Sequence, residues 1–285
     1  MTWRAARLAD WIAMLESIPA MLQFPAIDPV AVRLGPLAIH WYGLAYLVGI
    51  GLGWLILNHR AGQSQGKWSR DEVADLVFYA ALGGVLGGRL GYALFYNFAE
   101  YLREPSAILA VWRGGMSFHG GLLGFICAMG LFARRRQRAF LEVTDFVIPV
   151  VPLGLFFGRI ANFVNQELWG APSTLPWAVV FTDPAAGGLA RHPSQLYEAG
   201  LEGLLLFAIL HWLWRLRPPR GTISGAFLLG YGVFRFGIEF IREPDQHLGF
   251  LYDHWLTMGH VLSAPMAIAG IVMLIWARAQ RGASA

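Results

Sequence analysis

Charged and amide side chains directly follow an apolar run in the stretch GRIANFVNQELWG, residues 158–170. The run before it, VIPVVPLGLFF, contains no charged residue. Arg159, Asn162 and Gln166 are spaced i, i+3 and i+7, which places them on one face of an expected helix. Because a guanidinium binds phosphate through two parallel hydrogen bonds, this face is suited to an anionic ligand. A charge at membrane depth is costly, so an arginine is rarely there without a role.

Other side chains capable of chemistry lie at the ends of other apolar runs. Arg235 and Glu239 are spaced i, i+4 in GAFLLGYGVFRFGIEF. His119 begins a second run in GGMSFHGG, and His40 and Tyr42 begin a third in HWYG. If these runs cross a membrane in alternating directions, all of these groups lie at the same membrane depth as Arg159. Two guanidinium groups and a titratable histidine at one level favour a site for the phosphate of a lipid headgroup.

Each of these residues also has a purely structural interpretation. Arg235 and Glu239 can neutralise one another inside a helical bundle, and Arg159 can extend to the membrane interface. His119 can be a hydrogen-bonded histidine where two helices cross closely, and Tyr42 can belong to an aromatic belt. The occurrence of all of them at one level is what favours a site. Glycines are expected to allow close helix packing around it: Gly87, Gly88, Gly91, Gly114, Gly115, Gly120 and Gly121.

The composition is that of an integral membrane protein. Of 285 residues, 56% are hydrophobic and only 14% are charged, and the mean hydropathy is +0.48. Soluble domains carry about 25% charged residues, so this chain lacks the polar surface of a soluble protein. The net charge of +4 does not indicate nucleic-acid binding, because the basic residues form no patch interleaved with aromatic residues. The only cysteine, Cys127, lies in an apolar run, so we expect no disulfide, no metal and no cofactor.

Seven apolar segments approach the roughly 20 residues that a membrane-spanning helix requires. They are residues 41–58, 73–98, 116–133, 143–164, 196–214, 222–241 and 258–276. Lys and Arg alternate between the connections: twelve lie in 59–72, 134–142, 215–221 and the tail after 276, whereas four lie in 99–115, 165–195 and 242–257. The positive-inside rule therefore predicts that the N-terminus is outside and the C-terminus inside.

The predicted fold is a single all-α membrane domain, residues 1–285, with seven transmembrane helices. Within residues 1–24, apolar side chains recur at helical spacing opposite charged ones, which predicts an amphipathic helix lying on the outer interface. Residues 165–195 are expected to form a small extracytoplasmic head, because this connection contains the Pro- and Gly-rich segment 171–190.

Several other functions lack their sequence signatures. Ser117 and His119 are two residues apart and do not face each other on a helix, so they make no serine-protease pair. The chain has no H-E-x-x-H motif and no Walker A loop. It shows no internal repeat of the kind expected in a transporter. The alternative that remains open is a membrane protein that binds or moves an anionic lipid or solute without chemistry.

Six stretches in this order resemble the prolipoprotein diacylglyceryl transferase family: HWYG, GGRLGYALFYN, GGMSFHGG, GRIANFVNQELWG, RHPSQLYE and FRFGIEFIREPD. The resemblance covers about residues 24–277. It implies an enzyme of the bacterial plasma (inner) membrane with seven spans. Such an enzyme transfers the diacylglyceryl group of phosphatidylglycerol to the lipobox cysteine thiol of a prolipoprotein signal peptide, forming a thioether and releasing glycerol 1-phosphate. Its implied partners are these two substrates and membrane lipids, with no nucleic acid, metal or cofactor.

The resemblance also implies the site residues. The catalytic residues are His119, Arg159 and Arg235. The substrate-binding residues are Arg159, Asn162, Tyr42, Glu167, Gly170, Tyr231 and Glu239. The chain departs from the family pattern at Ala161 and Gln166, where glycine is expected, and its segment 171–190 is short.

The implied reaction gives these residues physical roles. A thiol must become a thiolate to attack carbon, and glycerol phosphate must leave as an anion. The two arginines, Arg159 and Arg235, are expected to hold the lipid phosphate and stabilise the charge that develops on the leaving group. His119 either accepts the thiol proton or orients the phosphoglycerol head.

Overall fold

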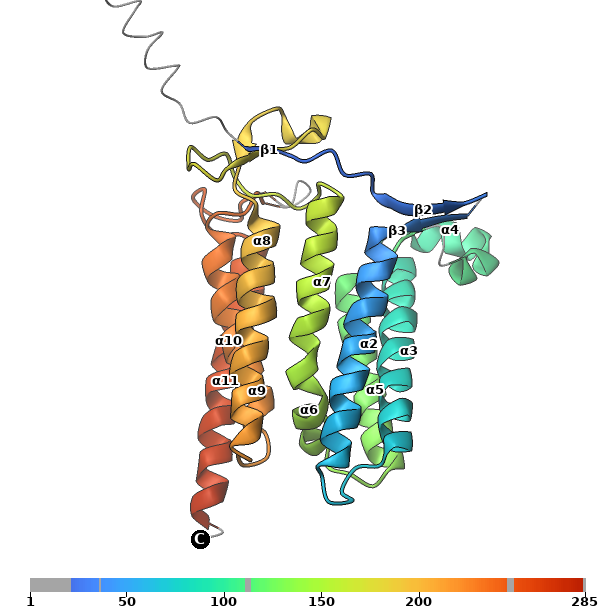
Figure 1. Ribbon diagram of the computed structural model, residues 1–285, viewed down its shortest axis with the longest axis vertical. Helices are drawn as coiled ribbons and strands as arrows, with labels where there is room; N and C mark the ends of the chain where they lie inside the picture. The colour runs from blue at the N-terminus through green and yellow to red at the C-terminus, as the bar shows by residue number, and fades with distance from the viewer. Residues whose placement is uncertain (1–21, 36, 111–113, 245–248, 284–285) are drawn as a thin grey trace, which may run out of the picture. The chain divides into compact units, whose positions relative to one another are not determined.

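The computed structural model describes residues 22–35, 37–110, 114–244 and 249–283, and it is mostly helical (Figure 1). Within these residues, helices occupy all seven segments that the sequence predicts. The helical elements are α2 (Trp41–Gly62), α3 (Arg70–Phe95), α5 (Phe118–Arg135), α6 (Phe140–Val147) with η3 (Ile148–Val150) and α7 (Val151–Val164), α8 (Ser194–Glu198) with the π-helix η5 (Ala199–Leu205) and α9 (Leu206–Arg215), α10 (Thr222–Glu239) and α11 (Met258–Ala283).

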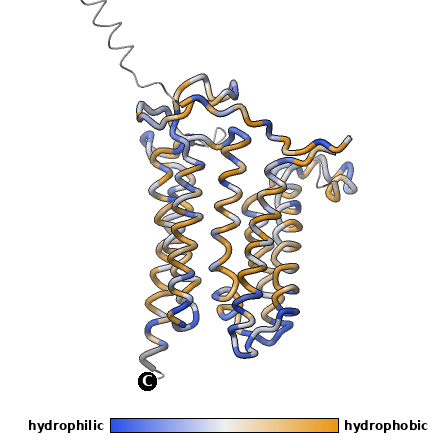
Figure 2. Tube along the Cα trace, viewed as in Figure 1, coloured by the Kyte–Doolittle hydropathy of each residue, from blue (hydrophilic) through white to orange (hydrophobic). Residues whose placement is uncertain are grey.

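Five helical segments of the described chain are long and apolar enough to cross a membrane: Trp41–Gly62, Arg70–Phe95, Phe140–Val164, Ser194–Arg215 and Met258–Gln280. Figure 2 shows hydrophobic residues along the helices and hydrophilic ones mainly at helix ends and connections. Helices α5 and α10 are not among the five. Each has 18 residues, and this length includes Arg134 and Arg135 in α5, and Arg235 and Glu239 in α10. The prediction of a helical membrane protein is thus confirmed at the level of five apolar helices.

The chain divides into two compact units, which we describe separately. The first unit comprises Met1–Val48, Gly154–Leu206 and Leu229–Ile268. The second comprises Gly49–Leu153, Phe207–Leu228 and Ala269–Ala285.

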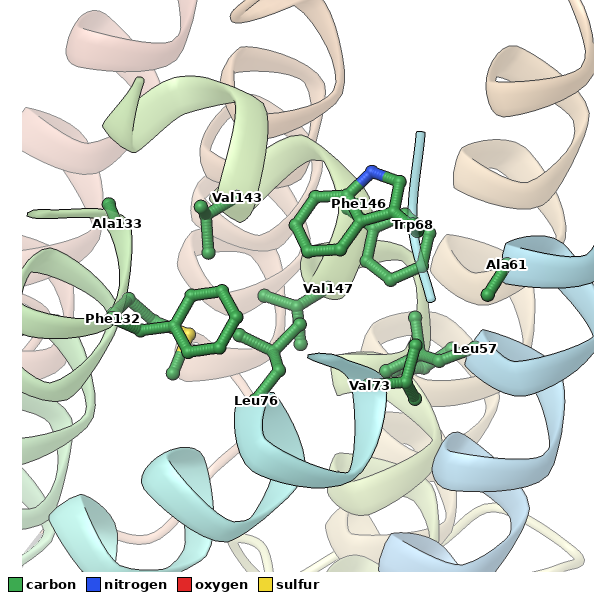
Figure 3. Close-up of a cluster of buried hydrophobic side chains, with 12 residues drawn as sticks. Leu57, Ala61, Trp68, Val73, Leu76, Phe132, Ala133, Val143, Phe146 and Val147 are labelled. Atoms are coloured by element: carbon green, nitrogen blue, oxygen red, sulfur yellow. The ribbon is translucent and has the colours of Figure 1, made fainter. Parts of the chain in front are cut away.

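The second unit has a hydrophobic core whose buried side chains include Leu57, Trp68, Leu76, Phe132 and Phe146 (Figure 3). The Trp68 ring stacks on Phe146 with centroids 4.1 Å apart and an interplanar angle of 7°. The Arg138 guanidinium covers the Trp68 ring at 4.0 Å and pairs with Glu72 at 2.9 Å. Glu72 in turn completes a capping box with Ser69 at the start of α3. These contacts tie the connection between α2 and α3 to the core.

Helices α3 and α5 pack backbone against backbone in the second unit. A Cβ atom added at Gly91 would lie 2.7 Å from the Gly120 Cα, and one at Gly87 would lie 2.7 Å from the Gly124 Cα. Neither space accommodates a side chain. Close glycine packing is therefore confirmed for Gly87, Gly91 and Gly120, whereas Gly114 has open space and a φ of +78°. That these glycines surround the candidate site stays a prediction.

Arg89 holds the connection between these two helices. The connection contains α4 (Phe98–Arg103) and η1 (Pro105–Leu109). The Arg89 guanidinium donates five hydrogen bonds to carbonyl oxygens in η1, directly after η1 and shortly before α5. The accepting carbonyls belong to Ala107, Ile108, Ala110, Gly114 and Gly115.

The first unit carries a small sheet above its helices. Strand β1 (Leu22–Gln23) pairs in parallel with β4 (Val179–Val180), which pairs antiparallel with β5 (Ala190–Arg191). Phe24 packs on Phe163 and Phe181, with ring centroids 5.3 and 5.8 Å apart. The connection expected as a loop head thus contributes two strands to a sheet that β1 completes, and its Phe181 packs in an aromatic cluster with Phe24 and Phe163.

A second pair of strands precedes the first described helix. Strand β2 (Val30–Leu34) pairs antiparallel with β3 (Leu37–His40), which leads directly into α2. The amphipathic helix predicted within residues 1–24 lies outside the described residues up to residue 21, and residues 22 and 23 form strand β1.

Candidate active site

Arg159 projects from α7 and is paired with two buried carboxylates. Its Nη2 lies 2.6 Å from Glu198 Oε2 and 3.7 Å from Glu202 Oε2. Both glutamate side chains are fully buried, and the arginine side chain is 17% exposed. The carboxylates keep the guanidinium charged and fixed, because an ion at this depth requires a partner. The geometry therefore does not match an arginine that simply extends to the membrane interface.

The segment that carries these glutamates packs tightly on α7. Glu198 ends α8 and Glu202 lies in the π-helix η5, four residues further along. A Cβ atom at Gly203 would lie 2.6 Å from the Phe156 Cβ, so this glycine allows the close approach. π-Helical turns are frequent at functional sites.

Arg235 and Glu239 form the i, i+4 pair that the sequence suggests on α10. Arg235 Nη2 lies 2.6 Å from Glu239 Oε2, and both side chains are almost completely buried. Thr257 Oγ1 donates a hydrogen bond to the other carboxylate oxygen, Oε1, at 2.7 Å. Arg235 Nη1 is buried without a hydrogen-bond partner among the described residues. A phosphate oxygen could satisfy this donor.

The two arginines belong to one electrostatic network. Glu202 interacts with Arg159, Arg235 and Arg242. Tyr231, from α10, interacts with both Arg159 and Arg235. Together with Glu198 and Glu239, the network contains three arginines and three glutamates, so it is close to neutral before any ligand binds.

Asn162, one turn beyond Arg159, is held by Glu167. Its Nδ2 donates to Glu167 Oε1 at 2.7 Å. The Tyr42 side chain, from the start of α2, interacts with Asn162 and Glu167, and its hydroxyl lies 3.4 Å from that of Tyr46. The backbone carbonyl of Glu167 accepts a hydrogen bond from Gln195 Nε2 at 2.7 Å. This arrangement presents one amide, one carboxylate and one phenol beside the arginine.

Gly170 lies where the head crosses close to other backbone. A Cβ atom there would lie 2.6 Å from the His192 Cβ and from the Ile241 carbonyl oxygen. Its N–H donates to the His192 carbonyl at 2.9 Å. Arg191 Nη1 donates to the Gly170 carbonyl at 3.2 Å and pairs with Glu243 at 2.8 Å. Only glycine fits this position without moving the head. The His192 ring is partly buried, which lowers its pKa.

The expectation that Gln166 shares a helical face with Arg159 is wrong, because α7 ends at Val164 and Gln166 has a φ of +54°. Its Oε1 instead accepts hydrogen bonds from Thr182 and from the Asp183 backbone N–H. Gln166 therefore organises the head.

The first unit contains eight of the nine residues that the sequence assigns to the site; His119 belongs to the second unit. His119 is exposed in the first turn of α5, where its ring meets Phe118 edge to face with centroids 5.6 Å apart. The neighbouring Ser117 caps this helix through a hydrogen bond from the Gly120 N–H, which gives the serine a structural role.

Sequence reasoning missed the two carboxylates that hold Arg159. Glu198 and Glu202 are four residues apart and both lie within the apolar segment 196–214. Ionisable residues in such a segment are themselves a signal of a site, so the same rule that selected the arginines could have found them. The described residues contain no group of three or more metal-ligating side chains.

These features define a class: a helical membrane protein whose apolar helices bury a network of arginines and glutamates on one unit. A family model for prolipoprotein diacylglyceryl transferases matches residues 29–276, and the chain belongs to this family. Three relatives are each named phosphatidylglycerol–prolipoprotein diacylglyceryl transferase. The protein of Methylococcus capsulatus is 56% identical, covering 92% of this chain and 100% of the relative. Those of Azotobacter vinelandii and Pseudomonas paraeruginosa are 55% and 54% identical, each covering 90% of this chain and 97% and 96% of the relative.

Proposed function

We propose that this chain transfers the diacylglyceryl group of phosphatidylglycerol to the lipobox cysteine of prolipoproteins. The observation that carries the proposal is its identity of more than half with relatives of that name along almost its whole length. The paired arginines of the first unit supply a site of the required chemistry, because they combine fixed positive charge with an unsatisfied buried donor.

In the proposed reaction, the cysteine sulfur attacks the glycerol carbon that carries the phosphate ester. A carbon–sulfur bond forms, the carbon–oxygen bond breaks, and glycerol 1-phosphate leaves with the bonding electron pair. The leaving phosphate gains negative charge as the bond breaks. In this proposal, Arg159 and Arg235 Nη1 stabilise this charge more strongly in the transition state than in the bound lipid.

The remaining site residues bind and position the substrate in this proposal. Asn162, Glu167 and Tyr42 offer hydrogen bonds to the glycerol hydroxyls, and Gly170 keeps the head close to the arginines. Tyr231 and Glu239 hold the two guanidinium groups. The proton of the cysteine thiol passes to His119. In the alternative, His119 orients the phosphoglycerol head and the proton passes to the leaving phosphate.

We further propose that α5 and α10 complete a set of seven spans in one membrane domain of the bacterial inner membrane, with the N-terminus outside. The twelve-to-four distribution of Lys and Arg supports this orientation. In a Cys127→Ser background, cysteines introduced at Gln65 and Gln137 should resist a membrane-impermeant thiol reagent in intact cells and react after lysis. Ready labelling of both in intact cells would reverse the orientation.

Transfer is tested directly with purified protein in phosphatidylglycerol vesicles and a lipobox peptide. The expected products are a diacylglyceryl thioether, identified by its mass, and an equal amount of glycerol 1-phosphate. Vesicles of phosphatidylcholine and a peptide with serine in place of the cysteine serve as controls. Binding of phosphatidylglycerol without any thioether in a folded preparation would favour the alternative, a lipid-binding or lipid-moving protein.

A further inference from the structure

A pocket lies in the second unit, between the last turns of α2 and α9. Its volume is about 340 Å³, which is in the range of small-ligand sites. The polar and aromatic residues that line it are His59, Arg60, Gln63, His211, Trp214 and Arg215. None of them belongs to the candidate active site.

Arg60 forms the buried part of this pocket. Its side chain is almost completely inaccessible, at 1% exposure. Nη2 donates to His211 Nδ1 at 2.8 Å, and the guanidinium carbon lies 4.4 Å from the centroid of the Trp214 ring. The remaining donors, Nε and Nη1, are buried and have no hydrogen-bond partner among the described residues. Such donors are costly to leave unpaired.

The pocket has positive charge without a compensating carboxylate. No lining residue is an Asp or Glu, and Arg60 forms no ion pair with any residue in the described part of the chain. The exposed Arg215 adds a second cation at the rim. His211 accepts a hydrogen bond from Arg60 at Nδ1. A histidine side chain is neutral or positive, so it does not offset the charge of the arginines. By contrast, Arg138 in the same unit pairs with Glu72 and Glu142.

From this geometry we propose that the pocket binds a phosphate group, held by the two free donors of Arg60 and by Arg215. Phosphate oxygens accept hydrogen bonds from guanidinium groups more strongly than neutral acceptors do. Two sources present this group: the headgroup of an anionic phospholipid and free phosphate in solution.

The surroundings of the pocket suit a membrane lipid as well as a free anion. Leu55 lines the pocket and is 56% exposed, and Trp212, next to His211 in sequence, is 60% exposed. Both helices end here in the arginine-containing connections that the charge distribution places on the cytoplasmic side. Basic pockets between helices on this side of a membrane bind anionic headgroups.

A local thiol reports on occupancy independently of diacylglyceryl transfer. In a Cys127→Ser background, Gln63→Cys places the only thiol in the pocket lining, and Gln137→Cys places it on an exposed connection as a matched control. The protein is reconstituted in phosphatidylcholine nanodiscs alone, in nanodiscs with added phosphatidic acid, or with inorganic phosphate. The rate of maleimide labelling is measured in each.

We expect phosphatidic acid, inorganic phosphate or both to slow labelling at residue 63 but not at residue 137. Protection by phosphatidic acid alone identifies a lipid headgroup, and protection by inorganic phosphate identifies a free anion. Arg60→Gln should weaken the apparent affinity for the phosphate group about tenfold or more, since the loss of one charge-assisted hydrogen bond weakens binding by at least that factor.

Arg215→Gln gives a second measurement that does not depend on a buried residue. Because Arg215 is exposed, the variant should fold normally and weaken protection by at most about fivefold. The proposal is wrong if labelling is the same in all three conditions, or if protection is unchanged in folded Arg60→Gln and Arg215→Gln proteins. Equal slowing at residues 63 and 137 also contradicts it, because that result reports surface charge alone.

Discussion

Buried arginines are stabilised differently in the two units of the protein. In the first unit, Arg159 and Arg235 each contact a glutamate carboxylate at 2.6 Å. In the second unit, Arg89 donates five hydrogen bonds to backbone carbonyls, and Arg60 contacts a histidine and a tryptophan. Carboxylates cancel the charge, carbonyl dipoles only solvate it, and an aromatic face does less than either.

The difference decides which arginine is available to a ligand. All three guanidinium nitrogens of Arg89 donate to carbonyls. Arg89 therefore stabilises the connection between α3 and α5 but has no free donor for a ligand. Arg235 retains one buried donor and Arg60 retains two. Unsatisfied buried donors thus mark Arg235 and Arg60, but not Arg89, as able to take a further ligand.

The largest effect is expected at Arg159. Arg159→Lys keeps a positive charge for Glu198, so the protein should insert and unfold at nearly the wild-type temperature. An ammonium cannot reproduce the planar guanidinium on phosphate. Transfer should fall about 100- to 1000-fold, the typical effect of losing a positioned donor in the transition state, while phosphatidylglycerol binding remains measurable.

Transfer, lipid binding and thermal unfolding are measured on the same preparation of Arg159→Lys. Arg33→Lys is the matched control, because Arg33 lies in β2 of the same unit and is 68% exposed. Near-normal transfer by Arg159→Lys would contradict an active-site role for this residue. Its ion pair with Glu198 would then be purely structural.

A smaller loss is expected at Arg235. Arg235→Lys should reduce transfer about 10- to 150-fold, equivalent to one charge-assisted hydrogen bond of about 1.5–3 kcal/mol. If Arg235 only balances Glu239, both the lysine variant and the double variant Arg235→Gln/Glu239→Gln should transfer almost normally. Measuring turnover of all three proteins in phosphatidylglycerol vesicles distinguishes the two roles.

The smallest effect on turnover is expected at Arg89. A lysine has three N–H donors and cannot reach all five carbonyls, so Arg89→Lys should lower the free energy of unfolding by about 1.5–3 kcal/mol. Transfer per folded molecule should stay close to normal. Denaturant unfolding in detergent is the measurement, with Arg135→Lys as an exposed control on α5. A loss of turnover as large as that of Arg159→Lys would erase the contrast between the two units.

Features that depend on residues close together in the sequence were predictable. Predominantly apolar runs located every long helix of the described residues, because a helix in lipid must satisfy its backbone internally and expose apolar side chains. Arg235 and Glu239 could be paired in advance because four residues on one helix bring them together. The close packing of Gly87, Gly91 and Gly120 was also expected from residue type alone.

Contacts between side chains far apart in the sequence could not be predicted in this way. The pairing of Arg159 with Glu198 joins residues on α7 and α8, and that of Arg60 with His211 spans 151 residues. Gln166 left the expected helical face because α7 ends two residues earlier. At the end of α7, the Gln166 side chain accepts hydrogen bonds from Thr182 and Asp183, and hydropathy does not report such contacts.

By itself, the sequence determined that this protein is a helical membrane protein, which segments form its helices, and that Arg89, Arg159 and Arg235 lie within them; Arg60 was expected in the connection 59–72 and instead lies in α2. The reason is that hydropathy and helical spacing act over one or two turns of the same chain. Only the tertiary structure decided which of those arginines meet carboxylates, which meet carbonyls and which retain free donors. That outcome depends on the packing of segments far apart in sequence, and the same packing sets how strongly each charge is compensated.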